Sequence, residues 1–143
     1  MADRTAHVTW SGSLMEGDGT ITSVDSGALG PLDVTWAARA EGDSAGLTSP
    51  EELIAAAHAA CFSMALSHDL AQAGTSPERL DVTATVTFVP GTGITKSALT
   101  VRGTVPGLNE AAFLEAAEAA KVGCPVSKAL AAVPEITLEA SLA

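Results

Sequence analysis

Apolar and polar residues alternate along three short segments near the start of the chain. Residues 7–11, 19–24 and 32–36 each show this alternation, and turn-forming residues such as Gly12 and Gly27 separate them. Alternation of this kind is typical of half-buried strands joined by turns. The pattern therefore predicts a β-meander.

The pattern changes to that of a helix after residue 48. Ser49 can cap the helix, Pro50 suits its first position, and Glu52 stands three residues after the cap, as in a capping box. The helix is expected to end near Gly74, which makes it roughly 23 residues and about 35 Å long. Residues 53–66 are apolar or small on nearly every side. Such a helix is buried all round or packs against a partner on several faces.

The rest of the chain returns to strands and shorter helices. We expect strands at residues 80–88, 94–105 and 135–142, a hairpin turn at 91–93, a helix at 110–121 and a short helix at 124–130. Asn109 caps the first of these helices, and Gly123 ends it. The order βββαββαβ, with antiparallel neighbours, predicts an α+β fold, and the length suits a single domain over residues 1–143.

Composition narrows the possible functions. The chain has 143 residues and a formal net charge of -10, which argues against binding nucleic acid or an anionic membrane surface. No apolar run approaches the eighteen residues of a membrane span, and the first residues do not resemble a secretory signal, so a cytoplasmic location is expected. In that reducing compartment the two cysteines are not expected to form a structural disulfide. They are also too few for a thiolate zinc site without other ligands.

Cys61 lies in the middle of the long helix, and two interpretations of it are open. Free cysteines are often inert and buried. A reactive cysteine needs a cation, hydrogen-bond donors or a helix N-terminus to stabilise its thiolate, and mid-helix burial supplies none of these. If Cys61 is reactive, another part of the fold must stabilise the anion.

Cys124 and Arg39 are the other candidates for thiol chemistry. Cys124 precedes a proline that starts a helix, where backbone amides favour a thiolate. It could condense with a sulfenic acid on Cys61, or the two thiols could be unrelated. Arg39 follows an alternating run, and its planar fork of donors could hold a thiolate and a peroxide oxygen; taken alone, it could equally be an exposed residue at a strand end.

The histidines give weaker signals. His58 lies three residues before Cys61, and in an apolar helix a hydrogen-bonded core histidine is the favoured interpretation. His58, Cys61 and His68 lack the closely spaced pair of helical zinc motifs, so no metal site is expected. Ser63 lacks the glycine context of a hydrolase nucleophile.

Two longer motifs resemble those of the OsmC/Ohr family, the osmotically inducible and organic-hydroperoxide-resistance proteins. Residues 48–67 (TSPEELIAAAHAACFSMALS) are similar to the motif of its first cysteine, and residues 122–130 (VGCPVSKAL) to that of its second. The residues of both motifs are more similar to those of the OsmC branch than to those of the Ohr branch. The resemblance extends over essentially the whole chain, including Trp10 and the region of Arg39.

The resemblance implies a function and a role for four residues. Cys61 matches the cysteine that attacks the peroxide, Cys124 the one that resolves the sulfenic acid as a disulfide, Arg39 the arginine that stabilises the thiolate, and Glu51 the glutamate that pairs with that arginine. It further implies an intertwined homodimer with antiparallel sheets around long central helices. The implied activity is reduction of organic hydroperoxides and hydrogen peroxide in oxidative or osmotic stress defence. It needs no bound cofactor or metal, only an external dithiol, which is a lipoylated protein in the Ohr branch. Small residues, Ala37 and Ala38, precede Arg39 where the family usually has bulky ones, which bears on the shape of the peroxide pocket.

Helix geometry adds an expectation about the dimer. Glu51 and Cys61 are ten residues apart, so about 15 Å separates them along one helix. A glutamate side chain cannot cover that distance. We therefore expect Arg39 and Glu51 to act on Cys61 of the partner subunit, unless the helix breaks near Leu53.

Two rival functions remain open at the level of the sequence. One is a different thiol chemistry at Cys61, such as hydrolysis or thiol transfer. The other is a dimeric protein that binds a small ligand or lipid and whose cysteines are inert. The preferred peroxide, the reductant and the inducing stress do not follow from the residues.

Overall fold

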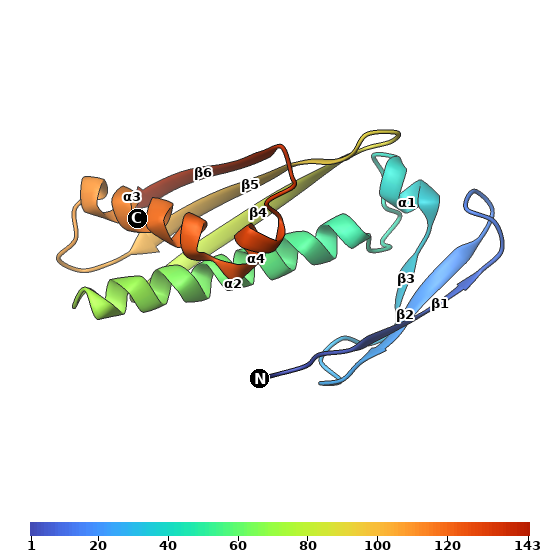
Figure 1. The fold of residues 1–143 in the computed structure, drawn as a ribbon, viewed down its shortest axis with the longest axis horizontal. Coiled ribbons are helices and arrows are strands. Elements are labelled where there is room, and N and C mark those ends of the chain that lie inside the picture. Colours follow the sequence, from blue (N-terminus) through green and yellow to red (C-terminus); the bar gives the residue numbers. More distant parts are fainter. The chain divides into compact units, whose positions relative to one another are not determined.

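The computed structural model describes residues 1–143, which form two compact units, Met1–Leu53 and Ile54–Ala143 (Figure 1). The elements are, in order, β1 (Ala6–Ser11), β2 (Asp18–Val24), β3 (Leu32–Val34), α1 (Trp36–Ala40), α2 (Pro50–Gln72), β4 (Arg79–Val89), β5 (Gly93–Thr104), α3 (Glu110–Gly123), α4 (Pro125–Ala129) and β6 (Glu135–Leu142). The α+β class is confirmed. The single domain over residues 1–143 stays a prediction.

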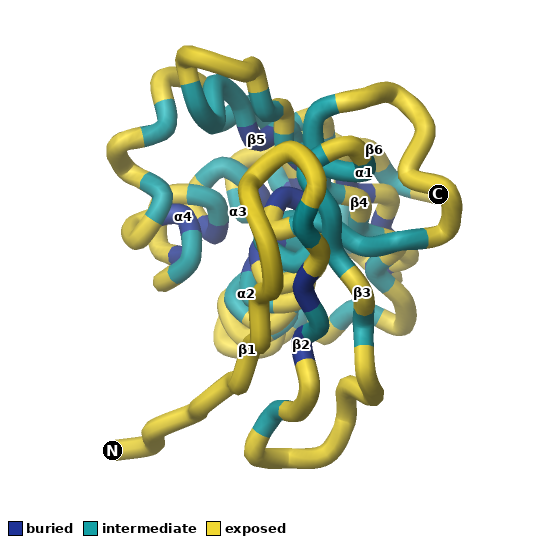
Figure 2. The backbone as a smooth tube through the Cα atoms, turned by 90° about the vertical axis from the view of Figure 1, so that its right-hand side faces the viewer, coloured by how far each residue is buried: buried dark blue, intermediate teal, exposed yellow.

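The first unit contains the predicted β-meander. Its sheet has the order β1-β2-β3, and both pairs of neighbours are antiparallel. Gly19 on β2 lies directly under the indole of Trp10, so closely that a Cβ there would stand 2.6 Å from the ring. All of β1 is exposed (Figure 2), whereas Ile21 on β2 is buried. This unit therefore buries little of its own apolar surface.

The predicted third strand is too long at its C-terminal end. The strand β3 stops at Val34, and the helix α1 begins at Trp36 because Thr35 caps it. The Thr35 hydroxyl accepts a hydrogen bond from the amide of Ala38 at 3.1 Å. A capping threonine followed by two alanines favours a helical turn over an extended strand. Arg39 consequently lies on a helix and not at the end of a strand, which was one interpretation of the sequence.

The long helix begins as predicted but with a different capping contact. The amide of Glu52 donates to the Ser49 hydroxyl at 3.2 Å. The Glu52 carboxylate accepts from the Thr48 hydroxyl at 2.6 Å, in place of the reciprocal bond of a capping box. The helix α2 is continuous from Pro50 to Gln72, so the alternative of a break near Leu53 is wrong.

The second unit has a three-stranded sheet of order β4-β5-β6, with one departure from expectation. The strands β4 and β5 form the predicted antiparallel hairpin, but β5 and β6 are parallel. Parallel neighbours need a long crossover connection, which α3 and α4 provide. The expectation of antiparallel neighbours throughout is therefore wrong for this pair.

Helices α2 and α3 pack against one face of this second sheet (Figure 1). Fully buried side chains from three elements form the core: Phe62, Leu66 and Leu70 of α2, Leu99 and Val101 of β5, and Phe113, Ala117 and Ala120 of α3. Gly103 of β5 leaves room for the Phe113 ring, since a Cβ on residue 103 would lie 2.6 Å from that ring. Cys124 is buried in the same core, and Cys61 packs against it.

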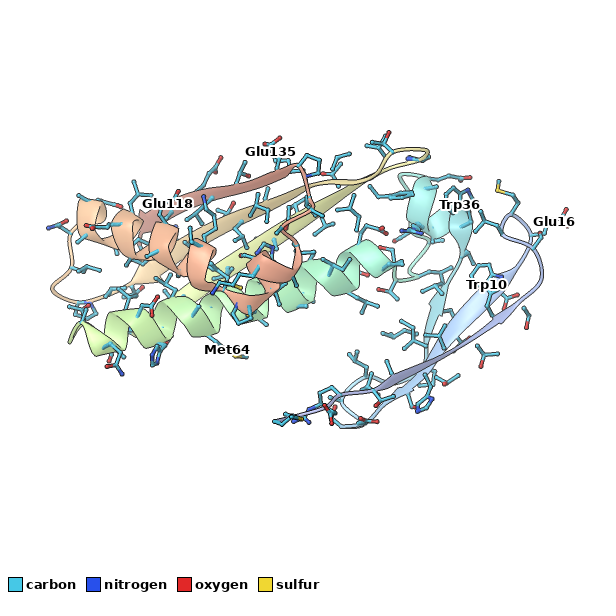
Figure 3. All side chains as sticks on the ribbon, viewed as in Figure 1. Trp10, Glu16, Trp36, Met64, Glu118 and Glu135 are labelled. Carbon is cyan, nitrogen blue, oxygen red and sulfur yellow. The ribbon has the colours of Figure 1, made fainter.

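Another face of α2 is not covered by the other elements of the second unit. Met64 is 71% exposed, and its side chain points away from the sheet (Figure 3). By length and composition α2 is apolar enough to cross a membrane, so the expectation that no run approaches that length was too strict. Core helices of water-soluble proteins meet the same criterion. In the middle of α2 the buried His58 hydrogen-bonds with two serines of the second unit, as a residue of a core helix does.

Candidate active site

The two cysteines meet in the second unit. Cys61 lies on α2 and is half-buried, whereas Cys124 is fully buried between α3 and α4. Both thiols are free, and they share a hydrogen bond. The question that the sequence left open, whether the two thiols are neighbours, is answered: they are in contact, as formation of a disulfide between them requires.

The environment of Cys61 does not favour its thiolate. Burial raises the pKa of the Cys61 thiol, and the neighbouring Cys124 raises it further, while a hydrogen bond from the Val126 amide lowers it. With these effects combined, the pKa of the Cys61 thiol lies above its ordinary value. A peroxidatic cysteine needs the opposite shift, so Cys61 requires a further positive group to react at neutral pH.

The environment of Cys124 has the opposite effect. Burial on its own would raise the pKa of the Cys124 thiol. The Ser127 amide, the Cys61 thiol, the Ser127 hydroxyl and the Val126 amide all donate toward its sulfur and outweigh burial, so the pKa is lowered. The sulfur makes no regular capping bond, but it occupies the cap position of α4, where such amides point toward an anion. Of the two thiols in one chain, Cys124 is thus the more acidic.

Arg39 and Glu51 form an ion pair within the first unit. Arg39 Nη2 lies 2.8 Å from Glu51 Oε1, and Arg39 Nε lies 3.1 and 3.2 Å from Oε1 and Oε2. The Glu51 side chain is 8% exposed and that of Arg39 is 32% exposed. A buried carboxylate gripped by two guanidinium nitrogens fixes the plane of the guanidinium. The predicted pairing of these residues is therefore present.

A small pocket lies beside Arg39 in the first unit. It has a volume of about 190 Å³ and is lined by Trp10, Leu14, Val34, Thr35, Trp36, Arg39 and Pro50. Trp10 comes from β1 and Trp36 from α1, and both are labelled in Figure 3. The lining is largely apolar, with the guanidinium as its one charged group. Although Ala37 and Ala38 are small, the two indole rings form bulky walls of the pocket.

His58 is buried in the second unit and hydrogen-bonds at both ring nitrogens. Nδ1 lies 2.7 Å from the Ser97 hydroxyl on β5, and Nε2 lies 2.9 Å from the Ser127 hydroxyl on α4. Burial lowers the pKa of His58, so the ring is neutral at pH 7. The interpretation of His58 as a hydrogen-bonded core histidine is confirmed. The 143 described residues contain no group of three or more His, Cys, Asp and Glu side chains that could hold a metal ion.

Some residues near these groups were not singled out from the sequence. Ser97 and Ser127 bond His58, Ser127 also bonds Cys124, and Leu14 borders the pocket at Arg39. Ser127 had a local signal, since it stands three residues after a cysteine that starts a helix. Ser97 and Leu14 had none, because only the folded chain brings them to these positions.

Comparison with known proteins now decides the family. The family described as OsmC-like protein matches residues 41–139. The chain is 46% identical over 136 residues to a protein of Escherichia coli (strain K12) named Peroxiredoxin OsmC, across 93% of this chain and 92% of that protein. The chain belongs to the OsmC family. The predicted resemblance is thereby confirmed.

Solved structures of OsmC-family proteins share the fold. The organic hydroperoxide resistance protein OhrB of Bacillus subtilis is 27% identical, with a TM-score of 0.67 over 96% of this chain and 98% of that one. An organic hydroperoxide resistance protein OsmC from Legionella pneumophila is 26% identical, with a TM-score of 0.64 over 97% and 96% of the two chains. The OsmC-like fold predicted from the motifs is confirmed.

Proposed function

We propose that this chain is a thiol-dependent peroxidase, an oxidoreductase that reduces organic hydroperoxides and hydrogen peroxide. The observation that carries the proposal is the contact between the free thiols of Cys61 and Cys124, in a chain 46% identical to a protein named Peroxiredoxin OsmC. Two thiols in contact are suited to a catalytic cycle that passes through a disulfide.

The first step is the attack of Cys61 on the peroxide. The Cys61 thiolate forms a bond to the terminal peroxide oxygen, and the O–O bond breaks. Cys61 becomes a sulfenic acid, and the leaving alkoxide or hydroxide takes up a proton and departs as an alcohol or water. The sulfur is oxidised by two electrons, and the peroxide is reduced by two.

The second step is resolution by Cys124. Its sulfur attacks the Cys61 sulfur, the S–O bond breaks, and the hydroxide that leaves becomes water. The lowered pKa of Cys124 and its contact with Cys61 suit it to this role. An external dithiol, with a lipoylated protein as a candidate, then reduces the disulfide by thiol–disulfide exchange. The proposed cycle uses no bound cofactor or metal.

Arg39 and Glu51 supply the positive group that Cys61 requires. Because α2 is continuous, the ten residues from Glu51 to Cys61 span about 15 Å along its axis. The Glu51 carboxylate is fully engaged with Arg39 on its own unit. We therefore place the guanidinium of one subunit against Cys61 of the other, where it lowers the thiolate pKa and binds a peroxide oxygen.

The apolar surface of the chain supports this homodimer. Val8, Trp10, Leu14, Met15 and Met64 are each more than two-fifths exposed. Large apolar side chains exposed on each of the two units are suited to an interface between subunits. A partner copy would cover the exposed face of α2 and complete the site.

The pocket at Arg39 indicates how the peroxide binds. Its indole rings offer an apolar wall to the organic group, while the guanidinium meets the peroxide oxygens. Preference for organic hydroperoxides over hydrogen peroxide follows from this lining. A role in oxidative or osmotic stress defence and a cytoplasmic location accord with such a substrate and with free thiols.

Turnover with defined thiols tests the proposal. The chain is given cumene hydroperoxide with dihydrolipoamide, thioredoxin or glutathione as donor, and peroxide loss is followed. Cys61→Ser is expected to abolish turnover, and Cys124→Ser to leave a sulfenic acid on Cys61 that dimedone traps. If Cys61→Ser retains full turnover, or if dimedone labels nothing in Cys124→Ser, the assigned roles are wrong. A chain that binds the peroxide but leaves both thiols reduced would favour a ligand-binding protein.

A further inference from the structure

A row of buried polar groups leads from the sheet to the sulfur of Cys124. Ser97 on β5, His58 on α2 and Ser127 on α4 are joined by hydrogen bonds of 2.7 and 2.9 Å through the two nitrogens of the imidazole. The first two side chains are fully buried, and Ser127 is 8% exposed. Placing a histidine and two hydroxyls in an apolar core is unfavourable unless each is hydrogen-bonded, and here each has a partner.

The direction of these bonds follows from their last member. The Ser127 hydroxyl lies beside the Cys124 sulfur and lowers the pKa of that thiol. A thiolate can only accept a hydrogen bond, so when Cys124 is deprotonated the Ser127 hydroxyl donates to it. Its oxygen must then accept from His58, which puts the single proton of the neutral ring on Nε2. Nδ1 is left as an acceptor, and the Ser97 hydroxyl donates to it. Every donor in the row therefore points toward Cys124.

From this arrangement we infer that His58 is a positioning residue, whose Nε2–H holds the Ser127 hydroxyl in the rotamer that donates to the Cys124 sulfur. Both ring nitrogens of His58 bond to serines and not to a cysteine, so His58 acts through Ser127. Its rigid ring, held at both ends, leaves Ser127 one favourable orientation. The inference rests on the proposed function in one respect, since the resolving thiol is the group that benefits.

The consequence concerns the second chemical step. When Cys124 attacks the Cys61 sulfenic acid, its sulfur must carry the negative charge that forms the new S–S bond. A hydroxyl donor held in place raises the fraction of thiolate at neutral pH, and the bond is given up as the disulfide forms. The attack of Cys61 on the peroxide does not involve this row, so the two steps should respond differently when it is broken.

Four substitutions separate this role from simple packing. Ser127→Ala removes the donor to the sulfur. In His58→Asn the side-chain amide nitrogen lies near the position of Nδ1 and cannot reach Ser127. In His58→Gln the amide nitrogen lies near the position of Nε2 and can still donate to Ser127. Ser63→Ala is the matched control, since that hydroxyl donates to the Ala59 carbonyl of its own helix at 2.7 Å.

The first readout is the pKa of Cys124 in a Cys61→Ser background, measured from thiolate absorbance against pH without any peroxide. Ser127→Ala and His58→Asn are expected to raise this pKa by about one pH unit, the effect of losing one hydrogen bond to the anion. His58→Gln and Ser63→Ala should leave it near the parent value. An unchanged pKa in Ser127→Ala, or equal values in His58→Asn and His58→Gln, would overturn the inference.

The second readout is the rate of disulfide formation in the chain with both cysteines, measured by rapid quenching and mass spectrometry. Ser127→Ala and His58→Asn should form the sulfenic acid at the parent rate and convert it to the disulfide about tenfold more slowly. A uniform slowing of both steps would indicate loss of packing and contradict the inference. If the parent chain itself does not react with peroxide, the proposed function fails while the titration of Cys124 still decides the role of His58.

Discussion

The thiol of Cys61 on α2 shares a hydrogen bond with the thiol of Cys124 at the start of α4. The bond links two helices that are separated in the chain by a hairpin and by α3. Burial raises the pKa of Cys61, whereas Cys124 lies below its ordinary value. In one chain the thiol proposed to resolve the sulfenic acid therefore has a lowered pKa, and the thiol proposed to attack the peroxide has a raised one. Two predictions about Arg39 depend on that difference.

The ion pair of Arg39 and Glu51 should control the first step. Arg39→Lys keeps the charge but loses the planar fork, and Glu51→Gln loses the carboxylate that holds it. Each is expected to slow oxidation of Cys61 by cumene hydroperoxide about 10²–10³-fold, as measured by stopped flow. Arg79→Lys is the control, because Arg79 forms a similar two-nitrogen pair with Asp81 on the exposed surface of β4. Rates for Arg39→Lys equal to those of Arg79→Lys would remove the guanidinium from the mechanism.

Mixed dimers should reveal which subunit provides the arginine. Arg39→Ala and Cys61→Ser chains are inactive in separate preparations on the proposed mechanism. Unfolded together and refolded, they form dimers in which one site pairs an intact Arg39 from one chain with an intact Cys61 from the other. Up to about half of the parent activity per mixed dimer is then expected. Activity no greater than that of the separate preparations would show that both residues act within one chain.

The contact between Gly103 and Phe113 should be intolerant of a methyl group. A Cβ on Gly103 would stand 2.6 and 2.7 Å from Phe113 Cζ and Cε2, in the fully buried core. Gly103→Ala is expected to lower the free energy of unfolding by about 1–3 kcal/mol in urea titrations. Gly123→Ala, at the end of α3 and facing open space, should change it by at most about 1 kcal/mol. Equal effects would contradict the packing described for β5 and α3.

The buried His58 should make the fold sensitive to acid. Because its pKa is lowered by burial, the folded chain binds the proton less tightly than the unfolded chain, whose histidine titrates near 6.5. Its contribution to stability is complete above about pH 6.5 and is lost as the pH falls through the lower folded pKa. Urea unfolding from pH 8 to pH 5 should show a steeper loss for the parent chain than for His58→Gln. Parallel losses would mean that His58 is not charged on unfolding.

Local sequence signals predicted much of this fold, and the places where they failed have physical reasons. Alternation and helix caps located the long helix and most strands, and the two cysteine motifs identified the family. The short helix at Arg39 was not predicted, because Thr35, which caps it, also fits the alternating pattern of a strand. The parallel pairing of β5 and β6 was missed because strand direction depends on the whole crossover and not on either strand.

The candidate site, too, was predicted from the sequence only in part. The motifs pointed to Cys61, Cys124, Arg39 and Glu51, and the structure brings them together as two pairs. The hydrogen bonds from His58 to Ser97 and Ser127 could not be predicted from spacing, since both serines lie on other elements far along the chain. Contacts between distant segments are set by packing, which a local pattern does not contain.

The most direct test of the central claim is a titration of free thiols with cumene hydroperoxide. The chain has two cysteines, and one equivalent of peroxide is expected to remove both thiols from each chain. Mass spectrometry of the unreduced digest should then show a Cys61–Cys124 disulfide within a single chain. Persistence of both thiols, or a disulfide that joins two chains, would contradict the account.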